Sequence, residues 1–232
     1  MDTHTLHPAE GETLVDTAYR GLRHDIIAGI RPPRERLRIE RLKALYGIGP
    51  TPLREALQKL AQDGLVVTEG NRGFRVAPLD PAEFADLNTA RTAIEKEALR
   101  LSIAHGGNDW EARVVAASYI MAKEDAALSA ASGAVPDSWE RANTEFHAAL
   151  VAACGSRWLL RVRAGLHDHC ARFRRASVYQ RLGSRDLGAE HAAISRAALD
   201  RDAERVCDLV ERHFALTAAI LEEDAGEDRP AP

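Results

Sequence analysis

Residues 37–79 read LRIERLKALYGIGPTPLREALQKLAQDGLVVTEGNRGFRVAPL, and they are the most informative residues for the fold of the first part of the chain. Leucines spaced three and four residues apart predict one helix over residues 39–46 and another from residue 50 to about residue 62. The turn Gly47-Ile48-Gly49 separates the two helices. Pro50 suits the first position of the second helix, because the N–H that proline lacks has no partner there. The segment therefore predicts two short helices joined by a tight turn.

Two runs of β-favouring residues, Leu65–Thr68 and Phe74–Val76, flank a glycine-containing segment and predict a hairpin. Upstream, apolar residues recur every four positions and predict an amphipathic helix that ends at Gly29; they are Leu14, Ala18, Leu22 and Ile26. Three helices and a hairpin are typical of a winged helix-turn-helix domain, here over residues 14–77. Such a domain places its third helix in the major groove of DNA.

The polar positions of the expected third helix are candidates for reading DNA bases. An arginine such as Arg54 engages both O6 and N7 of guanine, which contributes ~1–3 kcal/mol of discrimination. Basic residues before this helix and at the hairpin tip are candidates for phosphate contacts, which set affinity rather than sequence preference. Any one of these basic residues is more simply explained as a solvated surface charge. The prediction of DNA contact depends on their occurrence together on this motif. The residues expected to contact DNA are Arg34, Arg38, Thr51, Arg54, Gln58, Arg72 and Gly73.

Charge is unevenly distributed along the 232 residues. The net charge of -4 argues by itself against a nucleic-acid-binding protein, whose DNA-contacting domain is normally basic. Residues 14–77, however, carry 12 basic and 7 acidic side chains, a net of +5. Residues 80–232 carry 19 basic and 25 acidic side chains, a net of -6. The whole-chain value therefore hides a basic domain joined to an acidic one.

Membrane and secretion signals are not evident in the sequence. No window approaches the ~18 consecutive apolar residues that a transmembrane helix needs, and residues 1–13 lack an apolar core. We therefore expect a cytoplasmic protein without membrane contact. The three cysteines form no CxxC pair and are expected to be reduced residues of helix packing; they are Cys154, Cys170 and Cys207.

The second part of the chain is expected to be an all-α antiparallel bundle, so the protein as a whole is mainly α. Apolar periodicity predicts six helices, at residues 81–105, 110–131, 139–153, 158–178, 186–199 and 203–222. The resulting plan is an N-terminal arm (1–13), the winged domain (14–77), a linker (78–81), the helical domain (82–223) and a flexible tail (224–232).

Three histidines and one asparagine of the helical part are candidate metal ligands. Asn143 and His147 are four residues apart and share one helix face, while His191 and His213 come from two other expected helices. Three imidazoles and an amide oxygen suit a divalent metal ion. Spacing alone is weak evidence, because an isolated histidine on a helix is more often a packing or surface residue. Four other histidines are interpreted in that way: His24, His105, His167 and His169.

Residues 37–79 resemble the DNA-binding domain of GntR-family bacterial transcriptional regulators. The family hallmark TPxREAL is present at residues 51–57, GLV at 64–66 and RGxxV at 72–76. Many members have Ser-Arg before the TP, whereas this chain has Gly49-Pro50, so an arginine that often contacts DNA in the family is absent here. The resemblance implies a homodimer and a palindromic DNA operator, because the symmetry of a dimer is mirrored in its site.

Residues 82–220 resemble the FCD ligand-binding domain of the FadR branch of these regulators, in its shorter, VanR-like form with six helices. The matching motifs are RxxxE at residues 91–95, [DN]xxFHxxL at 143–150, EHxxI at 190–194 and HF at 213–214. The resemblance implies a divalent metal ion, Zn or alternatively Ni or Mn, bound by Asn143, His147, His191 and His213. Asparagine replaces the aspartate that is commoner at the first of these positions.

The resemblance also implies an effector that contacts Arg91 and Asn143. With neutral ligands the metal keeps a charge near +2, and Arg91 adds a further positive charge. A site with this balance attracts an anion, so a small carboxylate, or a dicarboxylate, is the expected effector.

A regulator, most simply a repressor and not an enzyme, is the favoured interpretation, and two alternatives stay open. A three-histidine site with open positions is chemically able to activate water, as in a metal-dependent hydrolase that carries a DNA-binding domain. Against the hydrolase, the sequence has no HExxH motif and fixes no carboxylate as a general base. In the second alternative the helical bundle serves only for dimerisation.

Overall fold

A computed structural model describes residues 6–70, 73–130, 135–180 and 185–227. The chain divides into two compact units, Met1–Leu79 and Asp80–Pro232. The first is a small mixed unit and the second is entirely helical in its described part. The expectation of a mainly α protein with a small β element is confirmed.

The first unit holds three helices and a small sheet. Its elements are α1 (Leu14–Ile27), β1 (Arg36–Leu37), α2 (Ile39–Tyr46), α3 (Pro50–Gln62), β2 (Val66–Thr68) and β3 (Phe74–Val76). The sheet is antiparallel in the order β1-β3-β2, with Leu37 opposite Phe74 and Val66 opposite Val76. Strand β1 was not expected, because two residues are too few to show an alternating pattern.

The local signals around α2 and α3 act as the sequence predicts. Gly47 ends α2 in the left-handed region, at φ 70°, and its N–H donates to the Lys43 carbonyl at 3.0 Å. Glycine reaches this conformation without the steric penalty of a Cβ. Gly49 is the N-cap of α3 and Pro50 is its first residue. This turn lets α2 and α3 pack on a common apolar core, in which Leu42, Leu53 and Leu57 are almost completely buried.

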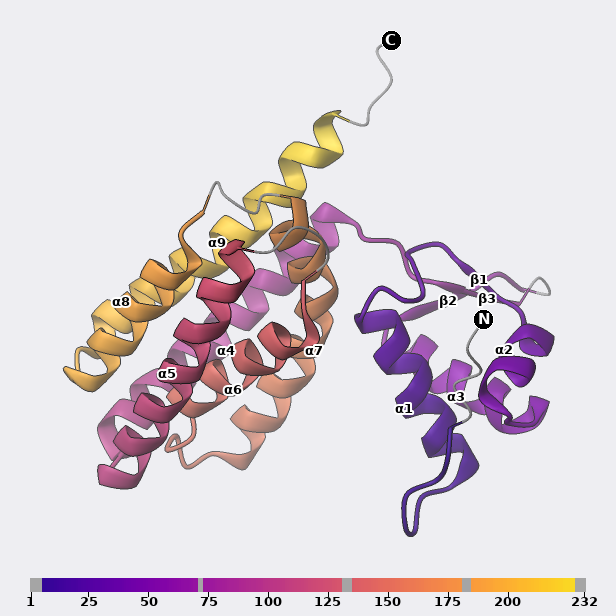
Figure 1. The fold of residues 1–232 in the computed structure, drawn as a ribbon, viewed down its shortest axis with the longest axis horizontal. Coiled ribbons are helices and arrows are strands. Elements are labelled where there is room, and N and C mark those ends of the chain that lie inside the picture. The colour runs from indigo at the N-terminus through magenta and orange to yellow at the C-terminus, as the bar shows by residue number, and fades with distance from the viewer. Residues whose placement is uncertain (1–5, 71–72, 131–134, 181–184, 228–232) are drawn as a thin grey trace. The chain divides into compact units, whose positions relative to one another are not determined.

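The second unit consists of six helices in its described residues. They are α4 (Pro81–His105), α5 (Asn108–Ala130), α6 (Asp137–Leu150), α7 (Arg157–Gln180), α8 (Leu187–Leu199) and α9 (Ala203–Glu227). Helix α4 packs against α7 and α9, helix α5 packs against α6 and α8, and α8 packs against α9 (Figure 1). The helices predicted from the sequence are therefore present, with ends that differ by a few residues.

The core of the helical unit mixes apolar and polar side chains. Trp139, Phe146 and Phe214 belong to a large apolar cluster. Buried with them are several ionisable or amide groups: Arg91, Glu95, Glu140, Asn143, His147, Arg163, His167, Arg174, His191 and His213. Polar groups are costly to bury unless they find partners, so each group of this layer needs a hydrogen-bond or charge partner. The three cysteines are free and buried, as expected. None of the described helices has the length and apolar character that crossing a membrane requires.

Leu57→Ala tests the packing of α3 against α1. The Leu57 side chain is fully buried, so its truncation should lower the free energy of unfolding of the first unit by ~2–5 kcal/mol. Leu14→Ala is the matched control, because Leu14 is 50% exposed. Urea unfolding followed by circular dichroism measures the difference; tryptophan fluorescence reports the second unit, which holds all three tryptophans. Equal effects of the two substitutions would contradict the predicted core.

Candidate functional site

Helix α3 presents a polar face away from the core of the first unit. Thr51, Arg54 and Gln58 are exposed, whereas Leu53 and Leu57 on the other face are buried. Arg54 makes no ion pair within the described residues, so its guanidinium is available to a ligand. Lys59, also a polar position of this helix, is instead tied to α1 by an ion pair with Asp16 at 3.1 Å.

Some basic residues of the wing, the small sheet β1–β3, are held by hydrogen bonds, and others in or next to it are exposed. Arg75 donates from Nε to Glu69 at 2.7 Å and from Nη1 to the Arg34 carbonyl at 2.7 Å, so it braces the sheet. The side chains of Arg34 and Arg38 are exposed and remain candidates for phosphate contacts. Gly73 is exposed at φ 98°, a conformation that favours glycine, and Arg72 lies outside the described residues.

The predicted histidines of the helical unit converge. His147 from α6, His191 from α8 and His213 from α9 each offer a ring nitrogen, and these atoms all lie within 4.8 Å of one another. All three side chains are buried. Asn143 lies one turn before His147, is completely buried, and has no hydrogen-bond partner for either amide atom in the described part of the chain.

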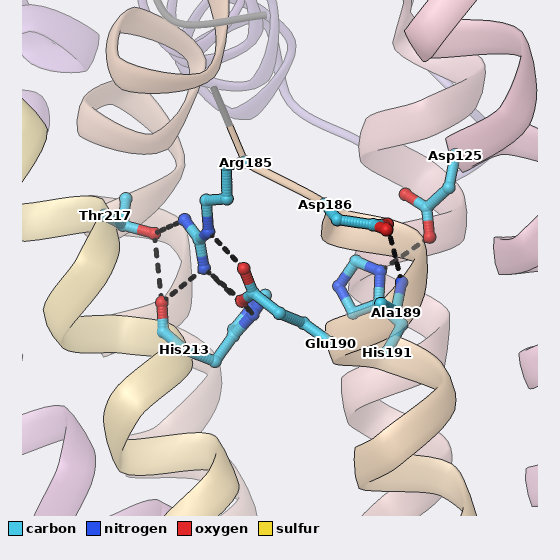
Figure 2. Close-up of polar contacts among 8 residues, drawn as sticks. All are labelled: Asp125, Arg185, Asp186, Ala189, Glu190, His191, His213 and Thr217. Carbon is cyan, nitrogen blue, oxygen red and sulfur yellow. Dashed lines mark hydrogen bonds and ion pairs between the residues drawn. The ribbon is translucent and has the colours of Figure 1, made fainter. Parts of the chain in front are cut away.

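A carboxylate orients the His191 ring. Its Nδ1 lies 2.7 Å from Oδ2 of Asp125 (Figure 2). The other Asp125 oxygen accepts a hydrogen bond from Trp139 Nε1 at 2.8 Å. Because the carboxylate accepts, Nδ1 carries the hydrogen and Nε2 keeps its lone pair. That Nε2 is buried and has no partner among the described residues. This arrangement leaves Nε2 of His191 able to coordinate a metal ion.

A second carboxylate orients His213. Its Nδ1 lies 2.8 Å from Glu190, and Arg185 holds this glutamate with two hydrogen bonds of 2.6 Å (Figure 2). Arg185 also donates to the His213 carbonyl at 2.7 Å and to Thr217 at 2.9 Å. Burial by itself would raise the pKa of Glu190, but the hydrogen bonds from Arg185 and His213 lower it to about 2. The glutamate is thus a fixed anion behind the ring.

Two of the three histidines, His147 and His213, are held in the neutral form that a metal ligand requires. Burial lowers the pKa of His213 to about 3, despite the opposing hydrogen bond to Glu190. Burial, followed by the charge of His213 and Arg91, holds the pKa of His147 well below its usual range. Nitrogens bound ~2.1 Å from one zinc ion lie within ~4 Å of each other, so the cluster needs only a small contraction to hold an ion.

Three of the buried arginines of this unit lie close enough for their charges to act on one another, and two of them have carboxylate partners. Arg163 of α7 grips Glu95 of α4 with bonds of 2.8 and 2.9 Å. Arg174 grips Glu140 with bonds of 2.7 and 3.3 Å. These bidentate pairs join neighbouring helices across the core.

Arg91 differs from both, although the sequence motif associates it with Glu95. Its guanidinium stacks 3.5 Å from the centre of the Phe214 ring, and Glu95 is taken by Arg163. No carboxylate in the described chain pairs with Arg91, and its Nε has no hydrogen-bond partner there. Burial lowers the pKa of Arg91 to about 10, so the group stays positively charged at neutral pH. An unpaired buried cation favours an anionic ligand.

Sequence reasoning missed Asp125, Arg185 and the bracing arginines of α7. A carboxylate at Asp125, between the buried positions Met121 and Leu128 of α5, was a usable signal because aspartate is seldom buried without a partner. Its contact with His191, 66 residues further along the chain, depends on the packing of α5 against α8.

Comparison with known proteins finds two family matches. Residues 14–76 match the bacterial regulatory proteins of the gntR family, and residues 86–216 match the FCD domain. The HTH-type transcriptional repressor GlaR of Escherichia coli (strain K12) is 36% identical over 88% of this chain and 94% of its own length. The uncharacterized HTH-type transcriptional regulator BphR of Paraburkholderia xenovorans (strain LB400) is 35% identical over 92% of this chain and 87% of its own length.

Solved structures share the fold. E. coli McbR/YncC is similar with a TM-score of 0.73 and 17% identity, over 92% of this chain and 99% of that one. A putative transcriptional regulator GntR from Rhodococcus sp. RHA1 has a TM-score of 0.72 and 22% identity, over 90% of this chain and 97% of that one.

Glu95→Ala tests the buried pairing of charges beside the cluster. Removing this carboxylate leaves Arg163 as an unpaired buried cation, so the free energy of unfolding should fall by ~3–5 kcal/mol. Glu204→Ala is the matched control, since Glu204 forms the same kind of bidentate pair with Arg100 at the surface and should matter little. Chemical denaturation measures both, and similar losses would contradict the assignment.

Proposed function

Because this chain belongs to the gntR family of bacterial regulatory proteins and carries an FCD domain, it is a DNA-binding transcriptional regulator, and we propose that it acts as a homodimeric repressor controlled by a metal-bound carboxylate effector. The relatives reported above are named as regulators rather than enzymes. One of them, GlaR, is named as a repressor, which supports repression as the direction of control.

The DNA site is formed by α3 and its surroundings in the winged unit. Thr51, Arg54 and Gln58 enter the major groove and read bases, whereas Arg34 and Arg38 contact phosphates. The exposed face of α3 supports these roles. Two copies related by a two-fold axis would read a palindromic operator whose half-sites are ~34–36 Å apart.

The metal site is the histidine cluster completed by Asn143. His147, His191 and His213 supply neutral nitrogens, which favour Zn, with Ni or Mn as alternatives. When bound, the ion supplies a Lewis-acidic centre for the oxygens of an anionic ligand. The carboxylates of Asp125 and Glu190, behind the rings, offset part of the charge of a bound metal ion. This compensates for the neutral Asn143, which stands where an aspartate is commoner.

The buried charge of Arg91 is the main observation that supports a carboxylate effector. It is a buried cation without a carboxylate partner in the described residues, and its charge depresses the pKa of His147 in the metal cluster. A carboxylate would bind the metal ion and Arg91 together. Control of DNA binding then requires that the effector bind more tightly to one conformation of the dimer than to the other.

Arg54→Ala tests base reading. We expect it to weaken binding to the specific operator by the equivalent of ~1–3 kcal/mol while largely sparing random DNA. Arg38→Ala, a proposed phosphate contact, should weaken both kinds of DNA alike and reduce the salt dependence. Fluorescence anisotropy at several salt concentrations measures all three proteins. Equal loss of both DNA types in Arg54→Ala would argue against base recognition.

His191→Ala tests the metal and effector sites. Elemental analysis of the purified variant should find the bound metal lost, while binding to the operator without effector persists, because α3 is unaffected. His105→Ala is the matched control, since His105 is exposed at the end of α4. Unchanged metal content in the His191 variant would refute the site. Absence of metal from the wild-type protein, with no calorimetric response to acids, would favour a bundle that serves only for dimerisation.

A further inference from the structure

His167 of α7 is a buried histidine outside the metal cluster. Its side chain is almost completely excluded from solvent. Its Nε2 lies 3.1 Å from Oγ1 of Thr144, the residue next to Asn143 on α6. His167 thus touches the helix that supplies two of the proposed metal ligands.

The hydrogen-bond pattern around Thr144 fixes the tautomer of His167. Oγ1 of Thr144 lies 2.9 Å from the Glu140 carbonyl oxygen, one helical turn earlier. Two oxygens at this distance need a hydrogen between them, and a carbonyl has none, so the threonine hydroxyl donates to it. The hydroxyl has no second hydrogen for the ring. His167 therefore donates from Nε2, and that nitrogen carries the hydrogen.

The other ring nitrogen is consequently an acceptor. Burial, and then the positive charges of Arg174, Arg91 and Arg163, hold the pKa of His167 well below its usual range. The ring is neutral, so a hydrogen on Nε2 leaves a lone pair on Nδ1. This Nδ1 is buried and has no hydrogen-bond partner within the described ranges. A buried acceptor of this kind requires a donor.

His167 belongs to the same polar layer as the proposed effector site. It follows Arg163 by one turn on α7, and Arg163 grips Glu95 one turn beyond Arg91 on α4. The charge of Arg91 acts on both His167 and His147. A ligand held at Arg91 therefore lies in the neighbourhood of the unsatisfied acceptor.

We infer that the effector carries a hydrogen-bond donor, a hydroxyl or an amine, in addition to its acid group, and that Nδ1 of His167 accepts from it. The inference rests on the proposed carboxylate site. A carboxylate at neutral pH offers only acceptors, which suit Arg91 and a metal ion but not a bare imidazole nitrogen. The class of ligand is thus a hydroxy acid or an amino acid rather than a plain carboxylic acid.

Matched pairs of acids test this preference with the zinc-loaded, full-length protein. Lactate with propionate, malate with succinate and 3-hydroxybutyrate with butyrate differ by one hydroxyl, and isothermal titration calorimetry measures each affinity. We expect the hydroxylated member of at least one pair to bind ~10-fold or more tightly, because a site built to pair with a hydroxyl rejects the analogue that lacks it. Equal affinities in every pair would overturn the inference alone. No binding of any acid would count against the carboxylate effector as well.

Two variants connect the preference to His167. His167→Leu removes the acceptor and should abolish the difference between paired acids while zinc content stays unchanged. His167→Asn keeps an acceptor oxygen near the place of Nδ1 and should preserve the preference. His105→Leu, at an exposed position, controls for loss of a histidine. A preference retained in His167→Leu would overturn the inference.

The tautomer is measured independently of any ligand. Protein labelled with ¹⁵N-histidine should give, for His167, the shift of an unprotonated Nδ1 and a protonated Nε2, assigned by its disappearance in His167→Asn. On addition of a preferred hydroxy acid the Nδ1 signal should move. A protonated Nδ1 in the free protein would refute the inference whether or not the variants fold well.

Discussion

A charge buried in the core of the helical unit has to be paired, and the arrangement of the polar side chains there follows from this constraint. Arg163 holds Glu95, Arg174 holds Glu140, and Arg185 holds Glu190, each through two hydrogen bonds. Removing one partner of such a pair leaves an uncompensated ion in a poorly polarisable interior. Two of these pairs link α7 to α4 and to α6, and all three contribute to the charge of the polar core.

The same constraint explains why His147 and His213 are neutral and why Arg91 is exceptional. His147 and His213 lie near cations, and Asp125 and Glu190 each accept a hydrogen bond from a ring nitrogen of the cluster. Neutral ligands alone would leave a bound metal ion near its full charge of +2. Asp125 and Glu190, which contact the outer nitrogens of two of the rings, offset part of that charge. Arg91 has a ring beneath it and no ion pair with a carboxylate in the described chain, although the nearby charge of Glu95 acts on it, and this supports the proposed anionic ligand.

Much of the DNA-binding unit was predictable because its signals are local. Gly47 at the end of α2 and Pro50 at the start of α3 act within one turn of the helices that they delimit. The periodic leucines identified the buried face and hence the exposed face that carries Arg54. Strand β1 was not predictable from the sequence, because its two residues are defined by their pairing with β3 rather than by any pattern of their own.

Local patterns in the sequence were sufficient to predict the two-part organisation and the helix positions, and to propose α3 as the DNA-reading helix and four residues as metal ligands. These follow from periodicity, capping residues and motifs, which depend on neighbours within a few positions. Other features became visible only in the folded chain: the contacts of Asp125 and Glu190 with the histidines, the pairing of Glu95 with Arg163 rather than Arg91, and the buried Nδ1 of His167 that has no partner among the described residues. Hydrogen bonds between helices tens of residues apart set these features, and their partners are chosen by packing and by the need to satisfy every buried polar group.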